Sequence, residues 1–211
     1  FPSTNLIFHE RGSIWNAKDK DLKVFRKNAL KAKIIIANSN ATKLMLSKRV
    51  GIPAKKIEVI YNGFFSKDES LKLKDNTRYS KRFSVGYIGR LDTPKGVHII
   101  IQSAKILRDC DFFIAGQGIL KNMLMKSAKN YKNIKFIGST KQPLEFISKM
   151  DTIVVPSIRE PLGNVVIEAG FCKKPVIASN IDGLAEIITN NINGILIDPS
   201  NNLSINKIPE K

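Results

Sequence analysis

The stretch that decides the fold reads Thr152-Ile153-Val154-Val155-Pro156-Ser157-Ile158-Arg159-Glu160-Pro161-Leu162-Gly163-Asn164-Val165-Val166-Ile167-Glu168-Ala169. Its first four residues form a short β-branched run without apolar/polar alternation, ended by a proline. That pattern is typical of a strand buried on both faces of a parallel sheet. After Gly163 the apolar residues recur at helical spacing. A strand, a loop and a helix in this order predict a parallel α/β unit.

Two glutamates frame the loop and the start of this helix. Glu160 follows the strand directly, and ligands bind outside the carboxyl ends of strands in open α/β sheets. The backbone N–H groups near Gly163 and Asn164 open the helix, so they can receive an anion. We expect Glu168, farther along the helix, to point back toward the same cleft.

The rest of the chain continues the alternation. Strands are predicted near residues 83–88, 111–115, 134–137, 175–178 and 194–197, with helices between them, which indicates a doubly wound parallel sheet. Before residue 83 we expect strands at 5–8, 34–37 and 57–60, a helix over 18–31, and a helix that Ser39 or Asn40 caps and that runs to about Val50. Residues 66–82 are polar and lack apolar periodicity, which predicts an interdomain linker.

Composition narrows the class of protein. The chain has 211 residues and 43% apolar residues, which is ample for a packed core. No apolar run approaches the roughly 18 residues that predict a transmembrane helix. The two cysteines, Cys110 and Cys172, are too few and too far apart for a disulfide framework or a zinc site, and we expect free thiols in a reducing cytoplasm. Phe1 and the absence of a signal peptide indicate an internal piece of a longer product.

The net charge of +17 is unevenly placed. Residues 1–82 carry 19 basic and 7 acidic side chains, and residues 83–211 carry 16 and 11. In the helix predicted over 18–31, four lysines lie opposite apolar positions: Lys20, Lys23, Lys27 and Lys31. Such a basic amphipathic helix can meet anionic lipid headgroups, although a generally lysine-rich chain explains it equally well. Nucleic acid is disfavoured, because no nucleic-acid module accompanies the charge.

Several segments resemble the retaining glycosyltransferases of family 4, which have the GT-B fold. The Glu160 to Glu168 spacing resembles the family's Glu-x7-Glu motif. The other matching segments are Phe8–Ser13, Ser39–Gly63, Val85–Gly96, Phe113–Gly118, Pro175–Ile188 and Asn193–Pro199. The resemblance implies two Rossmann-like domains with parallel sheets, the first only partly present. Residues 1–82 would be the second half of the acceptor-side domain plus the linker. Residues 83–211 would be the nucleotide-sugar-binding domain without its final helices, so we expect truncation at both ends.

The resemblance also implies roles for individual residues. Arg90 and Lys95 would hold the donor diphosphate, as a guanidinium fork and an ammonium point charge on one loop suit. Backbone amides at Leu162 and Gly163 would add donors. Glu168 would bind the ribose hydroxyls, and Glu160 would lie near the transferred sugar, neither acting as a nucleophile. His9 would be the active-site histidine. Gly116 and Gly118 would let the backbone approach the nucleotide, although a plain turn explains a Gly-x-Gly equally well.

No metal or other cofactor is expected. Asp109-Cys110-Asp111 looks like an Asp-x-Asp metal motif, but it precedes a strand and so lies at the edge away from the ligand. The expected function is that of a hexosyltransferase-type enzyme of capsule or lipopolysaccharide biosynthesis. It would move a sugar from a nucleotide-sugar to a cell-envelope polysaccharide or lipid-linked acceptor, in the cytoplasm, with peripheral membrane association left open.

Three alternatives remain at this stage. One is an inactive fragment that retains only nucleotide-sugar binding, and a second is a sugar-nucleotide epimerase of GT-B fold. A glycoside hydrolase would also use paired carboxylates. Arg90 and Lys95 count against the hydrolase, because glycoside cleavage has no diphosphate to hold.

Overall fold

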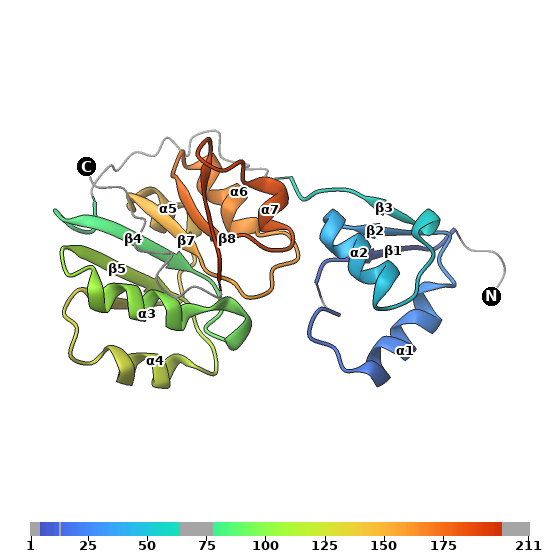
Figure 1. The fold of residues 1–211 in the computed structure, drawn as a ribbon, viewed down its shortest axis with the longest axis horizontal. Helices are drawn as coiled ribbons and strands as arrows, with labels where there is room; N and C mark the ends of the chain where they lie inside the picture. The colour runs from blue at the N-terminus through green and yellow to red at the C-terminus, as the bar shows by residue number, and fades with distance from the viewer. Residues whose placement is uncertain (1–4, 13, 64–77, 200–211) are drawn as a thin grey trace.

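The chain folds into two α/β units, each built on a parallel sheet (Figure 1). The computed structural model describes residues 5–12, 14–63 and 78–199. The α/β class and the parallel sheets expected from the sequence are confirmed. Most of the predicted linker, residues 66–77, and the end of the chain from residue 200 lie outside the described residues.

The first unit has a sheet of strand order β1-β2-β3. Its elements are β1 (Ile7–Glu10), α1 (Asp19–Ala29), β2 (Ile34–Ala37), α2 (Asn40–Lys48), the 3-10 helix η1 (Ala54–Lys56) and β3 (Ile57–Val59). The predicted cap of α2 is confirmed, since Ser39 Oγ accepts from the Thr42 amide at 3.0 Å. The prediction for the first strand was wrong by two residues: β1 runs to Glu10, so His9 lies within the strand and not after it.

The second unit has a sheet of strand order β6-β5-β4-β7-β8-β9. The strands are β4 (Phe83–Ile88), β5 (Cys110–Ala115), β6 (Ile134–Gly138), β7 (Thr152–Val155), β8 (Val176–Ser179) and β9 (Gly194–Ile197). The helices are η2 (Thr93–Lys95), α3 (Val97–Ile106), α4 (Lys121–Ala128), α5 (Pro143–Ser148), α6 (Asn164–Phe171) and α7 (Leu184–Ile187). All six strands fall within a residue or two of their predicted positions, because buried parallel strands are nearly continuous apolar runs.

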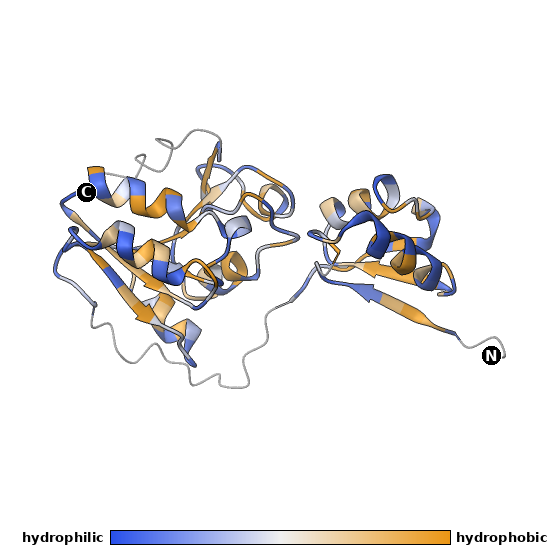
Figure 2. Cartoon of the chain, turned by 90° about the horizontal axis from the view of Figure 1, so that it is seen from below, coloured by the Kyte–Doolittle hydropathy of each residue, from blue (hydrophilic) through white to orange (hydrophobic). Residues whose placement is uncertain are grey.

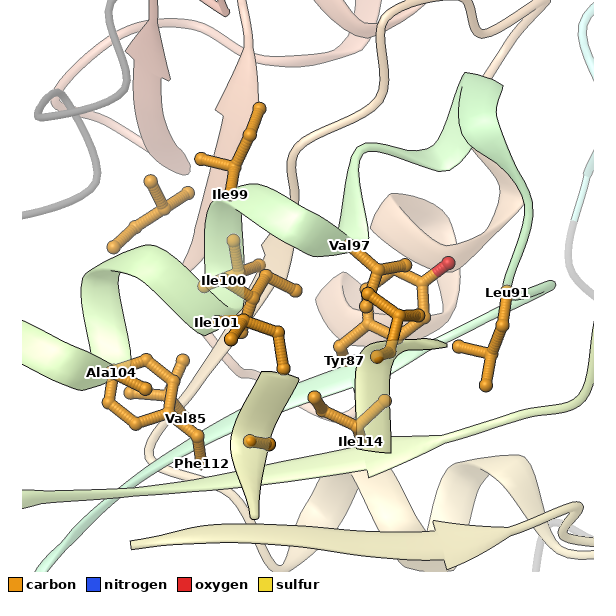
Figure 3. Packing of buried hydrophobic residues seen from close by; sticks show 14 of the residues in the cluster. Val85, Tyr87, Leu91, Val97, Ile99, Ile100, Ile101, Ala104, Phe112 and Ile114 are labelled. Carbon is orange, nitrogen blue, oxygen red and sulfur yellow. The ribbon is translucent and has the colours of Figure 1, made fainter. Parts of the chain in front are cut away.

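Helices cover both faces of the larger sheet (Figure 1), whose strands are largely hydrophobic (Figure 2). On one face α3 and α4 pack on β4 and β5, and Figure 3 shows Ile100, Ile101 and Val97 of α3 directed at the strands. On the other face α5, α6 and α7 pack on β5, β7 and β8. The sheet is therefore the middle of three layers, with a core on each side.

The strand order reverses between β4 and β7. Chain order runs outward from β4 through β5 to β6, and then returns to β7 on the other side of β4. At such a point the loops after the two central strands diverge and leave a crevice at their carboxyl ends, where open α/β sheets bind ligands. These two loops carry Arg90 and Lys95, after β4, and Glu160, after β7.

Two carboxylates anchor the opposite, amino edge of this sheet. Asp111 accepts from Ser80 at 2.5 Å and lies within 4.0 Å of the cations of Arg82 and Lys135. Asp151 pairs with Arg78 at 2.7 Å and accepts from the Ser84 amide. The Asp109–Asp111 segment thus fastens the chain at 78–82 to the sheet, on the edge away from the crevice.

The lysines of the basic helix point outward. Lys20, Lys23, Lys27 and Lys31 are exposed, while Leu22 and Ala29 of the same segment are buried. Among the helices of the described residues, none is long and apolar enough to cross a lipid bilayer.

Candidate active site

The loops after β4 and β7 interlock at the carboxyl edge of the larger sheet. Gly96, which ends the first loop, has φ +64°, and a Cβ there would overlap the carbonyl oxygen of Pro156. The Ile158 amide donates to Pro94 O at 2.8 Å. Only glycine allows this close approach with a left-handed backbone. Contact between the loops therefore fixes the side chains that they carry relative to each other.

Lys95 and Glu160 meet between these loops. Lys95 Nζ lies 2.6 Å from Glu160 Oε2, which also accepts from Ser157 Oγ at 3.1 Å. Glu160 is buried, and its own amide donates to Asp182 Oδ2 at 3.1 Å. A cation and a carboxylate are thus held in hydrogen-bond contact, and both are accessible from the crevice.

Arg90 is more exposed than Lys95: 69% of the Arg90 side chain is accessible to solvent, against 21% of the Lys95 side chain. Its guanidinium lies 3.1 Å from Asp92, and its carbonyl accepts from Tyr87 Oη at 2.6 Å. Burial raises the pKa of Tyr87 far above its usual value, so the phenol stays protonated and keeps donating. The backbone of Arg90 is held while its charged end remains free to meet a ligand.

The N-terminus of α6 faces the same crevice. Gly163 precedes the helix with φ +96°, and no side chain caps this end. Leu162 is buried, so its side chain packs inward and only its backbone can serve a ligand. The first amides of a helix without a cap, together with the helix dipole, favour an anion.

Three adjoining cavities occupy this region. The first, of about 240 Å³, is lined by both cations, by Glu160 and by the start of α6 at Gly163 and Asn164. The second, of about 200 Å³, shares Arg90, Lys95 and Glu160 with the first and adds Arg11 and Trp15 of the other unit. We call it the Trp15 pocket. A larger depression of about 560 Å³ lies at the amino ends of β8 and β9, and no sequence-predicted site residue lines it.

Glu168 lines the third cavity, of about 140 Å³, together with Arg11, Asn62, Gly63 and Asn164. We expected Glu168 to point into the same cleft as Glu160. The structure instead places the two glutamates in neighbouring cavities, and Asn164 lines both. Burial raises the pKa of Glu168. A partly desolvated carboxylate is a strong acceptor for hydroxyl donors.

His9, Gly116 and Gly118 line none of these three cavities. His9 is exposed on β1, next to the buried Glu10. The glycines sit against the loop after β4: a Cβ at Gly116 would overlap Gly89 O, and one at Gly118 would overlap Leu91 O. Gly116 and Gly118 allow the turn at 116–118 to pack closely on the loop that carries Arg90. In this contact the Leu91 amide donates to Gln117 O at 2.8 Å.

Polar contacts join the two units beside the cavities. Ser39 Oγ donates to Pro161 O at 2.5 Å, and Asn62 Nδ2 donates to Asn164 Oδ1 at 2.8 Å. Gly12 approaches Pro161 closely, since a Cβ on it would lie 2.7 Å from the proline ring. The first unit thus rests on the 160–164 loop itself, so the position of that unit affects the site.

Sequence reasoning missed several residues that line the site or hold it. Arg11, Trp15 and Arg159 line the Trp15 pocket, and Asp182 holds the Glu160 amide. Glu10 is also missed: its carboxylate accepts from the Gly12 amide at 2.6 Å and from the Ile14 amide at 3.4 Å. Arg11 and Glu10 neighbour His9, and Asp182 lies in a matched segment, so proximity to motifs is the signal that would have found them.

Comparison with known proteins now identifies the family. The model for "Glycosyl transferases group 1" matches residues 68–208. The chain belongs to this glycosyltransferase family. Its structural neighbours have the GT-B fold, which confirms the fold class expected from the sequence.

Individual relatives of the chain are named for the biosynthesis of capsular polysaccharide and of O-antigen. It is 30% identical to the capsular polysaccharide biosynthesis glycosyltransferase CapM of Staphylococcus aureus over 182 residues, covering 81% of this chain and 46% of that protein. It is 31% identical to the O-antigen biosynthesis glycosyltransferase WclY of Escherichia coli over 146 residues, covering 64% and 41%. The chain spans about half the length of such curated relatives.

A solved structure shows the same arrangement. Anabaena HepE in complex with UDP and glucose superimposes with a TM-score of 0.83 at 26% identity, over 96% of this chain and 60% of that one. HepE has also been solved with UDP-glucose, with the same score and identity and 61% of its chain covered.

Proposed function

We propose that this chain forms the donor-binding part of a retaining glycosyltransferase of family 4. The enzyme would transfer a hexose from a nucleoside-diphosphate sugar to a cell-envelope polysaccharide or a lipid-linked acceptor. The observation that carries the proposal is the meeting of Lys95, Arg90, Glu160 and the open end of α6 at the strand-order reversal between β4 and β7.

Sugar transfer from a nucleoside diphosphate requires positive charge beside the departing diphosphate. Breaking the bond between the anomeric carbon and the phosphate oxygen leaves negative charge on the departing diphosphate. Arg90 and Lys95 would meet that charge with the amides of Gly163 and Asn164. Because these groups supply the positive charge, the proposal requires no metal or other cofactor. Lys95 would then be shared between Glu160 and a phosphate oxygen.

The carboxylates take positioning parts in this scheme. Glu160 is held by Lys95 and Ser157, which suits a hydrogen-bond acceptor for sugar hydroxyls better than a nucleophile. Glu168 would accept from the ribose hydroxyls. We retain His9 as the active-site histidine that would contact the donor sugar and orient the acceptor. Gly116 and Gly118 stay proposed as the glycines that let the backbone approach the nucleotide.

Relatives support the acceptor class. A Campylobacter jejuni relative, 26% identical over 180 residues, is named as a 4-alpha-N-acetylgalactosaminyltransferase acting on a diphospho-undecaprenol-linked sugar. CapM and WclY are named for capsule and O-antigen biosynthesis. A cytoplasmic enzyme working at the inner membrane face fits such acceptors, and the exposed lysines of α1 offer a contact for anionic headgroups.

Calorimetric titration with UDP tests the proposal. We expect binding to the chain, and Arg90→Gln, Lys95→Gln and Glu168→Gln should each weaken it by about ten-fold or more, a loss of about 1.4 kcal/mol. Lys126→Gln, an exposed lysine on α4, is the matched control. Unchanged affinity in all three site variants would refute the assignment.

Catalysis is tested separately, by incubating the chain with radiolabelled UDP-glucose and measuring sugar release. Transfer or hydrolysis supports a working enzyme, whereas binding without either supports a part that holds the donor only.

The membrane contact is tested by sedimentation with vesicles. We expect binding to phosphatidylglycerol vesicles but not to phosphatidylcholine vesicles, and loss of binding when Lys20, Lys23 and Lys27 are changed to Gln together.

A further inference from the structure

The Trp15 pocket has features that the donor does not use. It lies where residues 11–12 and 15–16 of the first unit meet the loops after β4 and β7. Its charged lining is Arg11, Arg90, Lys95, Arg159 and Glu160. It shares three of these residues with the cavity at α6, but it lacks Gly163 and Asn164 and is completed by the first unit. The Trp15 pocket therefore opens from the same reacting centre toward the other unit.

Its charge is strongly positive. Four cations and one carboxylate line it, and the carboxylate of Glu160 is already paired with Lys95. Arg90 is paired with Asp92. Within residues 5–12, 14–63 and 78–199, Arg11 and Arg159 take part in no salt bridge with a partner inside 4.0 Å, and Arg159 donates to the backbone oxygen of Trp15 at 3.2 Å. Neither guanidinium therefore has a carboxylate in direct contact among these residues, although Arg159 also interacts electrostatically with Asp182.

The ring of Trp15 forms part of the same wall. Trp15 is 8% exposed and lines the pocket together with Arg11 and Arg159. Its indole Nε1 is closed to solvent, so a ligand in the pocket meets the ring and not the N–H. The donors that an anion would meet from this side are therefore those of the two arginines.

We propose that the Trp15 pocket binds an oxyanion group of the acceptor, a phosphate or a carboxylate, through Arg11 and Arg159. The inference rests on the proposed function, which places the donor diphosphate at α6. An anion held beside the Lys95–Glu160 pair, on the side of the first unit, would hold the acceptor next to the departing diphosphate, on the face of the sugar that a retaining transfer uses.

Tryptophan fluorescence can be used to follow binding in this pocket, because Trp15 is the only tryptophan of the sequence. The chain is first saturated with UDP, and pyrophosphate or glucuronate is then added at constant ionic strength while Trp15 fluorescence is followed. We expect a saturable change with at least one of the two. Pyrophosphate alone points to a diphosphate-linked acceptor, and glucuronate alone points to an acidic sugar.

Two arginine variants localise the binding. Arg159→Gln should weaken the anion by about ten-fold while leaving UDP affinity within about two-fold. Arg11→Gln should also weaken the anion by about ten-fold, and its UDP affinity is measured separately because Arg11 also lines the cavity of Glu168. Trp15→Phe keeps an aromatic ring in the wall, and calorimetry should show anion affinity within about two-fold of the parent. Lys126→Gln is again the control. Because Arg159 also bonds the Trp15 backbone, Arg11→Gln keeps the test independent of that contact.

The result that overturns the inference differs from the one that overturns the proposed function. If neither anion binds the UDP-loaded chain, if UDP abolishes anion binding, or if both arginine variants bind as the parent does, the Trp15 pocket is not an acceptor site. If UDP itself fails to bind, the proposed donor site is wrong instead.

Discussion

Glu186 Oε1 lies 2.7 Å from the backbone nitrogen of Ala41, so a carboxylate of one unit caps a helix of the other. Its second oxygen accepts from the Asn40 amide at 2.8 Å and from Tyr61 Oη at 2.7 Å. Figure 1 shows α7 and α2 on facing sides of the two units. A negative charge at a helix N-terminus is favourable, and here it also ties the first unit to the site.

The hydrogen bonds of Glu186 with Asn40, Ala41 and Tyr61 predict that the stability of the fold depends on pH. Burial alone raises the pKa of Glu186, but hydrogen bonds from Tyr61, Ala41 and Asn40 outweigh it and lower the pKa from 4.5. A carboxyl with a lowered folded-state pKa stabilises fully above its unfolded value and loses that contribution as the pH falls through the folded value. We expect Glu186→Gln to lower the free energy of unfolding by about 0.5 kcal/mol at pH 7, a figure kept small because the group is exposed.

Urea unfolding of parent and Glu186→Gln chains at pH 7 and below pH 4 checks this. The difference between the two should shrink at the lower pH. A difference that stays constant with pH would mean that the charge of Glu186 does not strengthen its hydrogen bonds to the first unit.

Lys95 should matter to stability as well as to binding. Lys95→Met leaves the buried Glu160 carboxylate with Ser157 as its remaining side-chain donor, and an uncompensated buried charge is costly. We expect a loss of about 2 kcal/mol in the free energy of unfolding at pH 7, measured by denaturant titration. Lys126→Met, on an exposed helix face, should change it by less than about 0.5 kcal/mol. The double variant Lys95→Met/Glu160→Gln should recover part of the loss, and no recovery would contradict the pair's energetic role.

Replacing Gly96 and Gly170 by alanine should change the free energy of unfolding in opposite directions. Gly96→Ala forces a Cβ against Pro156 O at φ +64°, so we expect a loss of about 2 kcal/mol or more together with weaker UDP binding, because Lys95 must shift. Gly170, inside α6, has open space around it, and Gly170→Ala should gain about 0.5 kcal/mol without changing UDP affinity. Thermal unfolding and calorimetry of both variants decide the matter. Equal effects of the two changes would show that loop contact does not position Lys95.

Glu168 should trade stability for binding. Burial raises its pKa, so its ionised form is less favourable in the folded chain than in the unfolded one. The sign follows: stability is highest below about pH 4.5 and declines as the pH rises through the raised folded-state pKa. We expect Glu168→Gln to be slightly more stable than the parent at pH 7, on the order of a few tenths of a kcal/mol after solvent screening, while binding UDP more weakly. A variant that loses stability at pH 7 would show instead that Glu168 has a structural partner.

Much of the fold was predictable because its signals are local. The β-branched run at 152–155, the largely apolar stretch at 83–88 and the helical spacing after Gly163 predicted strands and helices within a residue or two. The motif loops gave the candidate cations and carboxylates, and the structure places Arg90, Lys95 and Glu160 around one cavity. The end of the first strand was missed, because a polar pair such as His9-Glu10 gives no apolar signal although Glu10 is buried.

By itself, the sequence determined the order of strands and helices, the parallel α/β class and the loops that carry the charges, since each depends on residues close together in the chain. Only the tertiary structure decided which of those charges meet. Lys95 and Glu160 are 65 positions apart, and Glu186 and Ala41 are 145 apart. Whether Glu168 shares a cavity with Glu160 or with Arg11, and whether the indole N–H of Trp15 has a partner, depends on how distant loops pack. Periodicity along the chain carries no information about that packing.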